Sequence, residues 1–159
     1  MKFNSALRNF VLVLFSTLLI SACSTAKKAS VDTVDDVYTG TDTVEYLAKG
    51  VPDRVFFATN KSKLTTRSRD TLRKQATFLR KNKDVTVTLE GHADERGTRE
   101  YNLALGERRA NAAKDYLMTY GVSGKRISVI SYGKEKPVNP ASTPLAWSQN
   151  RRSVTIKTN

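Results

Sequence analysis

One acidic and one basic side chain stand out in the segment from Gly91 to Ala113. Asp94 lies in a loop bounded by Gly91 and Gly97 that follows an expected strand, and Arg109 lies on the expected helix that comes next. Because the two charges are opposite and sit on different elements, a pocket that presents both would hold a zwitterion. Its ammonium would bind Asp94 and its carboxylate would bind Arg109. This is a binding geometry, with no nucleophile placed beside a base.

Each of these residues also has a purely structural interpretation. Asp94 could form the turn itself, because aspartate hydrogen-bonds well to nearby backbone in loops. Arg109 could make a structural salt bridge to Asp94 or to another acid. Helical phase places Arg109 at the edge of the expected buried face and its neighbour Arg108 almost opposite, in solvent. Gly91 and Gly97 are expected to supply backbone freedom.

The elements that must position these residues follow from hydrophobic periodicity. Strands are expected over residues 55–58, 85–90, 127–132 and 153–157, helices over 66–81 and 102–120, and a short helical turn over 145–149. The second helix has an apolar stripe at spacings of three and four, formed by Leu103, Gly106, Ala110, Ala113, Leu117 and Tyr120. The order of elements predicts an α/β two-layer sandwich of the α+β class, with helices packed against a sheet.

The central motif resembles a known family. His92-Ala-Asp-Glu-Arg-Gly-Thr98 and Leu105-Gly-Glu-Arg-Arg-Ala110 are similar to the peptidoglycan-binding loop and helix of OmpA-like C-terminal domains, in the branch of the peptidoglycan-associated lipoproteins. The resemblance extends over about residues 54–156. It implies an OmpA-like β-α-β-α-β-β mixed sheet that binds the meso-diaminopimelate end of the peptidoglycan stem peptide. In that family the positions of Asp94 and Arg109 grip the ammonium and the carboxylate.

The resemblance implies further ligand-binding residues around these two. Phe57, Thr59 and Asn60 correspond to the family turn that lines the pocket, and Asn60 replaces an aspartate that is common there, which removes one negative charge. Asn102 either caps the second helix or bonds the ligand. Leu105 lies outside the apolar stripe, so we expect it to form an apolar pocket wall.

Several other residues have two interpretations. Glu95 and Arg96 are either partner contacts, which we favour, or simple exposed charge. His92, the one histidine of the chain, is either a pH-sensitive loop contact or a polar strand-end residue, and we favour the second. The segment 150–152 resembles a family signature and is expected to be structural. Trp147 is expected to be a core or rim aromatic.

The beginning of the chain has the composition of an export signal. Lys2 and Arg8 accompany an apolar run that is too short to span a bilayer. Ile20-Ser-Ala-Cys23 resembles a bacterial lipobox, so we expect a signal peptide over residues 1–22 and acyl chains, palmitate among them, on Cys23. The alternative is a membrane anchor that is never cut.

Three regions follow from this pattern. Residues 1–22 form the signal peptide, 23–45 the lipidated cysteine with a flexible tether poor in large apolar residues, and 46–159 one OmpA-like domain. A single cysteine cannot form an internal disulfide. The absence of aspartate after Cys23 implies, by resemblance to other lipoproteins, anchoring at the periplasmic face of the outer membrane.

The composition also narrows the class of partner. A formal net charge of +12 favours an anionic partner, and export argues against nucleic acid. The sequence contains no phosphate-cradling loop and no set of metal ligands, so we expect no cofactor and no metal. An enzyme that acts on the wall would need an acid–base pair or a metal that the sequence lacks, so we expect no catalysis.

The resemblance completes the expected function. It implies peptidoglycan, TolB and other Tol-Pal components as partners, together with outer-membrane lipid through Cys23. The protein would then link the outer membrane to the wall, support envelope integrity and act in constriction at cell division. The alternative is a protein-interaction module that binds TolB and carries a vestigial wall pocket.

Overall fold

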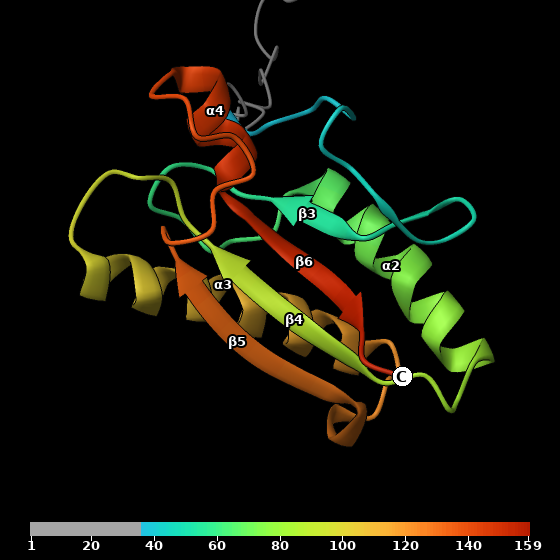
Figure 1. Cartoon of the computed structure of the whole chain (residues 1–159). Coiled ribbons are helices and arrows are strands. Elements are labelled where there is room, and N and C mark those ends of the chain that lie inside the picture. Colours follow the sequence, from blue (N-terminus) through green and yellow to red (C-terminus); the bar gives the residue numbers. More distant parts are fainter. Residues whose placement is uncertain (1–35) are drawn as a thin grey trace, which may run out of the picture. The chain divides into compact units, whose positions relative to one another are not determined.

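The computed structural model describes residues 36–159, and the expected signal peptide and lipidated Cys23 lie outside the described residues. The strands of a four-stranded sheet lie in the order β3-β6-β4-β5 (Figure 1). A small β1–β2 hairpin accompanies this sheet. The elements are β1 (Tyr46–Ala48), β2 (Val51–Pro52), β3 (Arg54–Phe56), α2 (Thr66–Lys81), β4 (Val87–His92), α3 (Arg99–Thr119), η2 (Gly124–Arg126), β5 (Ile127–Gly133), α4 (Pro144–Asn150) and β6 (Arg152–Lys157). The predicted α+β sandwich with a mixed sheet is confirmed. None of the helices within 36–159 is long and apolar enough to cross a membrane.

The strand directions bring several strand ends to one edge of the sheet. β6 is antiparallel to both β3 and β4, whereas β4 and β5 are parallel and are joined through α3. Phe56 at the end of β3 pairs with Arg152 at the start of β6, and Gly91 near the end of β4 pairs with Ser153. The segments that follow β3, β4 and β5 therefore meet the segment that precedes β6.

The core lies between the sheet and the two long helices. Figure 1 shows α3 running behind β4 and β5, and α2 beside β3. The buried apolar side chains of this core are Val55, Phe57, Leu72, Ala76, Leu79, Val87, Leu89, Ala110, Ala113, Leu117, Val122 and Ile127. Burial of each of the larger side chains stabilises the fold by roughly 1.5–3 kcal/mol, so this layer fixes the strand ends that carry the loops.

Helix α3 begins earlier than its periodicity predicts. Thr98 is its N-cap, and the Thr98 side chain accepts a hydrogen bond from the backbone N–H of Tyr101 at 3.2 Å. The helix therefore starts at Arg99, and the interpretation of Asn102 as a cap is wrong. The cap sits directly after the Gly97 loop, so the loop and the helix start as one continuous structure.

The buried face of α3 is also rotated from the predicted stripe. Asn102, Leu105 and Arg109 are buried together with much of that stripe, whereas Tyr120 is exposed. Arg108 is exposed, as its phase predicts. Because Arg109 belongs to the buried face, its guanidinium lies inside the domain and not at the edge of that face.

Helix α3 and strand β4 approach each other where two glycines meet. A Cβ atom on Gly91 would lie 1.8 Å from the carbonyl oxygen of Gly106, which no side chain can accommodate. Gly91 is thus required by close packing, and the expectation that it supplies backbone freedom is corrected. Gly97 has a φ of 90°, so there the expected freedom is used.

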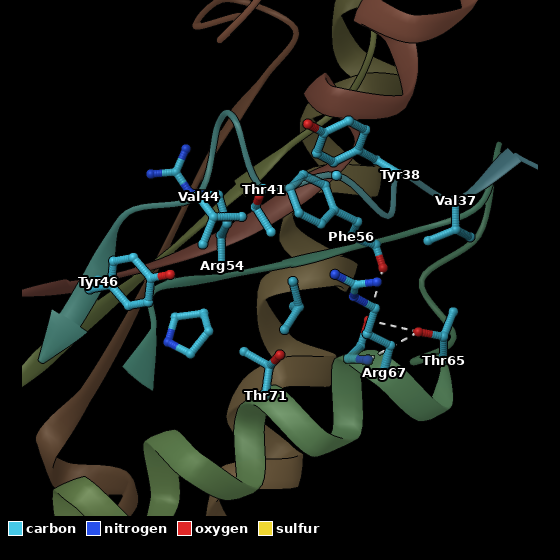
Figure 2. Close-up of a pocket in the computed structure, with 14 residues that line it drawn as sticks. Val37, Tyr38, Thr41, Val44, Tyr46, Arg54, Phe56, Thr65, Arg67 and Thr71 are labelled. Atoms are coloured by element: carbon cyan, nitrogen blue, oxygen red, sulfur yellow. Dashed lines mark hydrogen bonds between the residues drawn. The ribbon is translucent and has the colours of Figure 1, made fainter. Parts of the chain in front are cut away.

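Residues 36–45, which we expected in the tether, lie against the domain. Tyr38 is only 6% exposed, and its ring meets that of Phe56 edge-on at 4.8 Å (Figure 2). The backbone N–H of Glu45 donates to Asp53 Oδ1 at 3.2 Å. The packed part of the chain therefore begins before the boundary at residue 46.

Candidate functional site

The candidate site lies at the edge of the sheet where β3 and β4 end and β6 begins. A pocket of about 390 Å³ opens there between the turn after β3, the loop after β4 and helix α4. Its lining residues are Asp36, Val37, Thr59, Arg96, Pro144, Leu145, Trp147, Ser148 and Arg151. Thr59, a predicted ligand-binding residue, and Arg96, a predicted partner contact, line this pocket.

Asp94 lies directly behind this pocket and is 7% exposed. Its Oδ1 accepts hydrogen bonds from the backbone N–H of Arg96 at 3.2 Å and from Arg96 Nε at 3.1 Å. Its Oδ2 accepts from Arg96 Nη2 at 2.7 Å and from Arg151 Nη1 at 3.4 Å. These donors match the roughly four lone-pair positions of a carboxylate. The hydrogen-bond acceptor positions of Asp94 are therefore occupied by donors of the chain itself. The bond from the Arg96 N–H also forms the predicted turn.

The electrostatic environment keeps Asp94 ionised. Burial by itself raises the pKa of the Asp94 carboxyl, but the hydrogen bonds and the charge of Arg96, with a contribution from Arg151, hold the pKa below its usual value. A buried carboxylate that stays charged is suited to a cationic group, because exchanging one cation for another leaves the local charge unchanged.

Arg109 is fully buried and donates to backbone carbonyls. Its Nε, Nη1 and Nη2 bond to the carbonyl oxygens of Lys61 at 2.9 Å, His92 at 2.8 Å and Ala58 at 3.1 Å. These bonds use three of the five N–H donors of a guanidinium. They tie the turn after β3 to the end of β4, and so hold together the two segments that form the pocket.

This geometry does not support the alternative of a structural salt bridge for Arg109. The guanidinium lies in the interior, and its three hydrogen bonds go to backbone carbonyl oxygens instead of to Asp94 or another acid. Its role in ligand binding stays a prediction. Burial, followed by repulsion from Arg151, lowers the pKa of Arg109 to about 10, so the group still carries its charge at neutral pH. Arg109 therefore adds positive potential beneath the turn.

Arg151 is a central residue of the site that the sequence interpretation treated only as structural. Its side chain is buried, and its Nε donates to the carbonyl oxygen of Phe57 at 3.1 Å while its Nη1 reaches Asp94. Its Nη2 donates to the backbone oxygen of Asp36 and lies 3.6 Å from the Asp36 carboxylate. Arg151 thus connects the turn, the loop and the N-terminal segment.

The loop after β4 is clamped onto helix α4. Trp147 Nε1 and Ser142 Oγ donate to the two carboxylate oxygens of Glu95 at 2.8 and 3.0 Å. The Arg96 guanidinium lies 4.4 Å over the Trp147 ring, and Lys134 Nζ donates to the backbone oxygen of Glu95 at 3.2 Å. Glu95 and Arg96, favoured as partner contacts, are therefore exposed residues that also make contacts within the chain, and their role as partner contacts stays a prediction.

The remaining predicted residues support the site without lining it. Phe57, predicted in the turn that lines the pocket, and Leu105, predicted as an apolar wall, are buried and do not line this pocket, so a contact with the ligand stays a prediction for both. Asn102 Nδ2 donates to the backbone oxygen of Arg96 at 2.8 Å and so anchors the loop. Asn60 is exposed at a φ of 55°, a left-handed conformation that asparagine tolerates better than most residues. It is part of the turn, but not of the pocket lining.

His92 takes the structural role that we favoured. It is 2% exposed at the end of β4, beside Tyr132, and neither ring nitrogen has a hydrogen-bond partner within the described part of the chain. Burial, then the positive charges of Arg152 and Arg54, lower the pKa of His92 to about 3. This lowered pKa keeps the ring neutral near physiological pH, although its Nε2 lies 3.7 Å from the Glu90 carboxylate.

A separate cavity of about 80 Å³ lies between the N-terminal segment, β3 and the start of α2 (Figure 2). Tyr38, Val44 and Phe56 contribute much of its apolar wall, and its lining contains no carboxylate. It therefore lacks a group to pair with an ammonium. Within residues 36–159, no three histidine, cysteine, aspartate or glutamate side chains are grouped to hold a metal.

The signals for the missed residues differ. Arg151 precedes β6, and an antiparallel β6 beside β4 would have placed it next to the Asp94 loop, so a topological argument could have found it. Trp147 stands on the short helix before that strand. Asp36 lies in a polar segment with no periodicity, and no local pattern indicates its contact with Thr59.

Comparison with known proteins agrees with the geometry. The OmpA family profile matches residues 56–151. The chain is 55% identical over 106 residues to the peptidoglycan-associated lipoprotein of Rhizobium meliloti (strain 1021). That alignment covers 67% of this chain and 60% of the relative. It is 42% identical over 153 residues to the protein of the same name from Mesorhizobium japonicum. This second alignment covers 93% of this chain and 91% of the relative. The chain thus spans less than two thirds of the Rhizobium relative and nearly all of the Mesorhizobium relative.

Solved structures show the same fold. The crystal structure of the peptidoglycan-associated lipoprotein from Burkholderia pseudomallei aligns with a TM-score of 0.65 at 34% identity, over 67% of this chain and 90% of that chain. The C-terminal domain of Helicobacter pylori MotB aligns with a TM-score of 0.63 at 21% identity, over 67% of this chain and 84% of that chain, a likeness of fold alone. By profile, sequence and fold, the chain belongs to the OmpA family and, within it, to the peptidoglycan-associated lipoproteins.

Proposed function

We propose that this protein binds peptidoglycan noncovalently by holding the zwitterionic meso-diaminopimelate end of a stem peptide. The observation that carries the proposal is a pocket lined by Arg96 and Arg151, whose guanidinium groups both bond to the Asp94 carboxylate behind it. The buried Arg109 supports the turn that completes the lining. An ionised carboxylate beside fixed guanidinium groups is complementary to a group that carries an ammonium and a carboxylate together. The names of the relatives, peptidoglycan-associated lipoproteins, support this ligand.

The ammonium would bind Asp94 by replacing the guanidinium of Arg96. The Arg96 side chain is 43% exposed, so it can move aside without disturbing the core. The ligand carboxylate would then lie in the positive potential of Arg151, which lines the pocket, and of the buried Arg109. Because the bonds of Arg109 to backbone carbonyls hold the turn in place, Arg109 would act from the interior, as a support and as a source of positive charge.

We also propose that the chain is anchored through acyl chains on Cys23 at the periplasmic face of the outer membrane, and that it acts with TolB and other Tol-Pal components. The lipobox-like segment before Cys23 and the relatives' names support the anchor. The proposed role is a noncatalytic one: to link the outer membrane to the wall, to maintain envelope integrity and to support constriction at division. The exposed edge that carries the pocket is the surface where TolB would compete with the wall.

Sedimentation with isolated peptidoglycan tests this proposal. The parent protein and the variants Asp94→Asn and Asp84→Asn would be mixed with purified sacculi and centrifuged. Both variants lose one negative charge, but Asp84 lies before β4 with its side chain exposed, away from the strand ends that form the site. We expect parent and Asp84→Asn to sediment with the wall and Asp94→Asn to remain largely in solution. Equal sedimentation of all three would contradict the proposed site.

A further inference from the structure

The N-terminal segment places a carboxylate of the chain itself in the candidate site. Asp36 Oδ2 accepts a hydrogen bond from the backbone N–H of Thr59 at 2.6 Å. The same oxygen lies 3.6 Å from Arg151 Nη2, which also donates to the Asp36 backbone oxygen. A backbone N–H and a guanidinium that converge on one oxygen form a carboxylate-binding arrangement.

This arrangement is built into the domain and does not depend on Asp36. Arg151 is 3% exposed and is held from behind by the carbonyl oxygen of Phe57 and by Asp94. Thr59 lies in the turn that Arg109 fixes through the carbonyl oxygens on either side of it, at Ala58 and Lys61. Both donors would therefore stay in position if the N-terminal segment moved away.

Asp36 is suited to leave this position. Its carboxylate is 39% exposed, and it comes from a segment before the first strand of the domain. Although burial raises its pKa, the hydrogen bonds from Thr59 and the charges of Arg151 and Arg96 bring the pKa below its usual value. Asp36 is thus ionised at neutral pH, and another carboxylate could replace it without a change of charge.

We infer that the Thr59 N–H and the Arg151 guanidinium form a carboxylate subsite that Asp36 occupies in cis until a carboxylate of the wall peptide replaces it. The inference rests on the proposed function and names the part of the site that receives the ligand's negative end. While Asp36 occupies the subsite, the Arg96 guanidinium is bonded to the Asp94 carboxylate. The chain's own guanidinium and carboxylate therefore stand where the two charges of the zwitterion would bind.

Occupation of the subsite by Asp36 affects the affinity for the ligand and the distance between Cys23 and the domain. A ligand that needs the subsite empty binds with an affinity reduced by the fraction of molecules in which it is empty. When the ligand binds, Asp36 and its neighbours leave the domain surface. The segment that connects Cys23 to the domain then becomes longer. The distance that it can span increases by at most about 3.5 Å for each residue released.

The variant Asp36→Asn tests the inference. The asparagine keeps the size of the side chain but removes the charge, so it should compete less well for Thr59 and Arg151. The full chain, solubilised in detergent, would be titrated calorimetrically with a soluble stem tetrapeptide that contains meso-diaminopimelate. We expect Asp36→Asn to bind roughly fivefold more tightly than the parent. Asp84→Asn, with the same change in net charge, should bind as the parent does.

The outcomes separate this inference from the proposed function. If the parent binds and Asp36→Asn binds equally or more weakly, occupation in cis is overturned and the proposed function stands. If the parent and both variants fail to bind, both are overturned. A second measurement follows the segment directly: addition of the peptide to the parent should increase the fast motion of the Val37 amide in NMR relaxation. An unchanged Val37 amide in a saturated complex would overturn the inference.

Discussion

At the residue scale, neighbouring side chains of one type have opposite environments. Arg108 is exposed, whereas Arg109 is fully buried and bonded to three carbonyl oxygens. Helical phase separated the two arginines correctly, but it could not give the depth of Arg109. That depth depends on the turn after β3, whose carbonyls close over the guanidinium, and such long-range partners leave no mark in local periodicity.

The first prediction compares these two arginines. Arg109→Ala should lower the free energy of unfolding by on the order of 3–5 kcal/mol, because it leaves buried carbonyls without donors and a cavity beneath the turn. Arg108→Ala should change it by less than about 0.5 kcal/mol. Urea unfolding of both variants measures the difference. Similar losses in the two would show that the buried face of α3 is assigned wrongly.

The second prediction concerns the pH dependence of stability. The pKa of His92 is about 3 in the folded state, below its ordinary value of 6.5, because the buried ring resists a charge. The unfolded chain therefore binds a proton between these values that the folded chain does not. Stability present above pH 6.5 is lost as the pH falls, by up to about 1.4 kcal/mol per pH unit.

A variant isolates this contribution. The chain has one histidine, and the carboxyls of Asp36 and Asp94, with pKa values lowered from 3.8, titrate below the window from pH 6.5 to 5. His92→Gln should therefore remove the slope of unfolding free energy across this window, whatever its effect on absolute stability. Parallel slopes for parent and variant in urea unfolding at several pH values would refute the assignment.

At the element scale, the site depends on how closely α3 lies against β4. The approach of Gly91 to Gly106 sets the height of the helix above the strand, and so the position of the loop that both elements carry. The third prediction follows: Gly91→Ala should lower the free energy of unfolding by at least about 3 kcal/mol, because its Cβ would collide with backbone.

Gly124→Ala serves as the matched control. The added Cβ would meet only the flexible end of Met118, at 3.2 Å, so the loss should stay within about 1 kcal/mol. Thermal unfolding of the two variants compares a backbone clash with a side-chain contact. A Gly91→Ala protein as stable as the control would show that α3 can move away from β4 at little cost.

The elements also show how far the sequence could predict the fold. The range 66–81 for the first helix was correct, because a strong apolar stripe and the Thr65 cap coincide. The order of the sheet strands and helices along the chain was correct as well. The β1–β2 hairpin was missed, since strands as short as Tyr46–Ala48 and Val51–Pro52 carry no readable alternation. In the site, Asp94 could be singled out from its loop, but Asp36 and Arg151 come from segments 115 residues apart in the sequence.

At the scale of the whole molecule, the described structure is a state in which the binding site is satisfied by the chain itself. The Asp94 carboxylate is bonded to the guanidinium groups of Arg96 and Arg151. The Asp36 carboxylate supplies a negative charge beside the Thr59 N–H. If the protein binds and releases peptidoglycan as proposed, such a state leaves Asp94 and Arg151 paired when the ligand departs. The lipobox-like Cys23 and the N-terminal segment would then connect membrane attachment with wall binding.

The central claim is that the pocket recognises both charges of a zwitterion, and a pair of ligands tests it most directly. The parent protein would be titrated calorimetrically with a stem tetrapeptide that contains meso-diaminopimelate and with the same peptide that contains lysine, which keeps the ammonium but lacks the carboxylate. We predict binding of the first and a loss of roughly tenfold or more with the second, since a charge-assisted hydrogen bond is worth about 1.5–3 kcal/mol. Equal affinity for the two peptides would contradict the account.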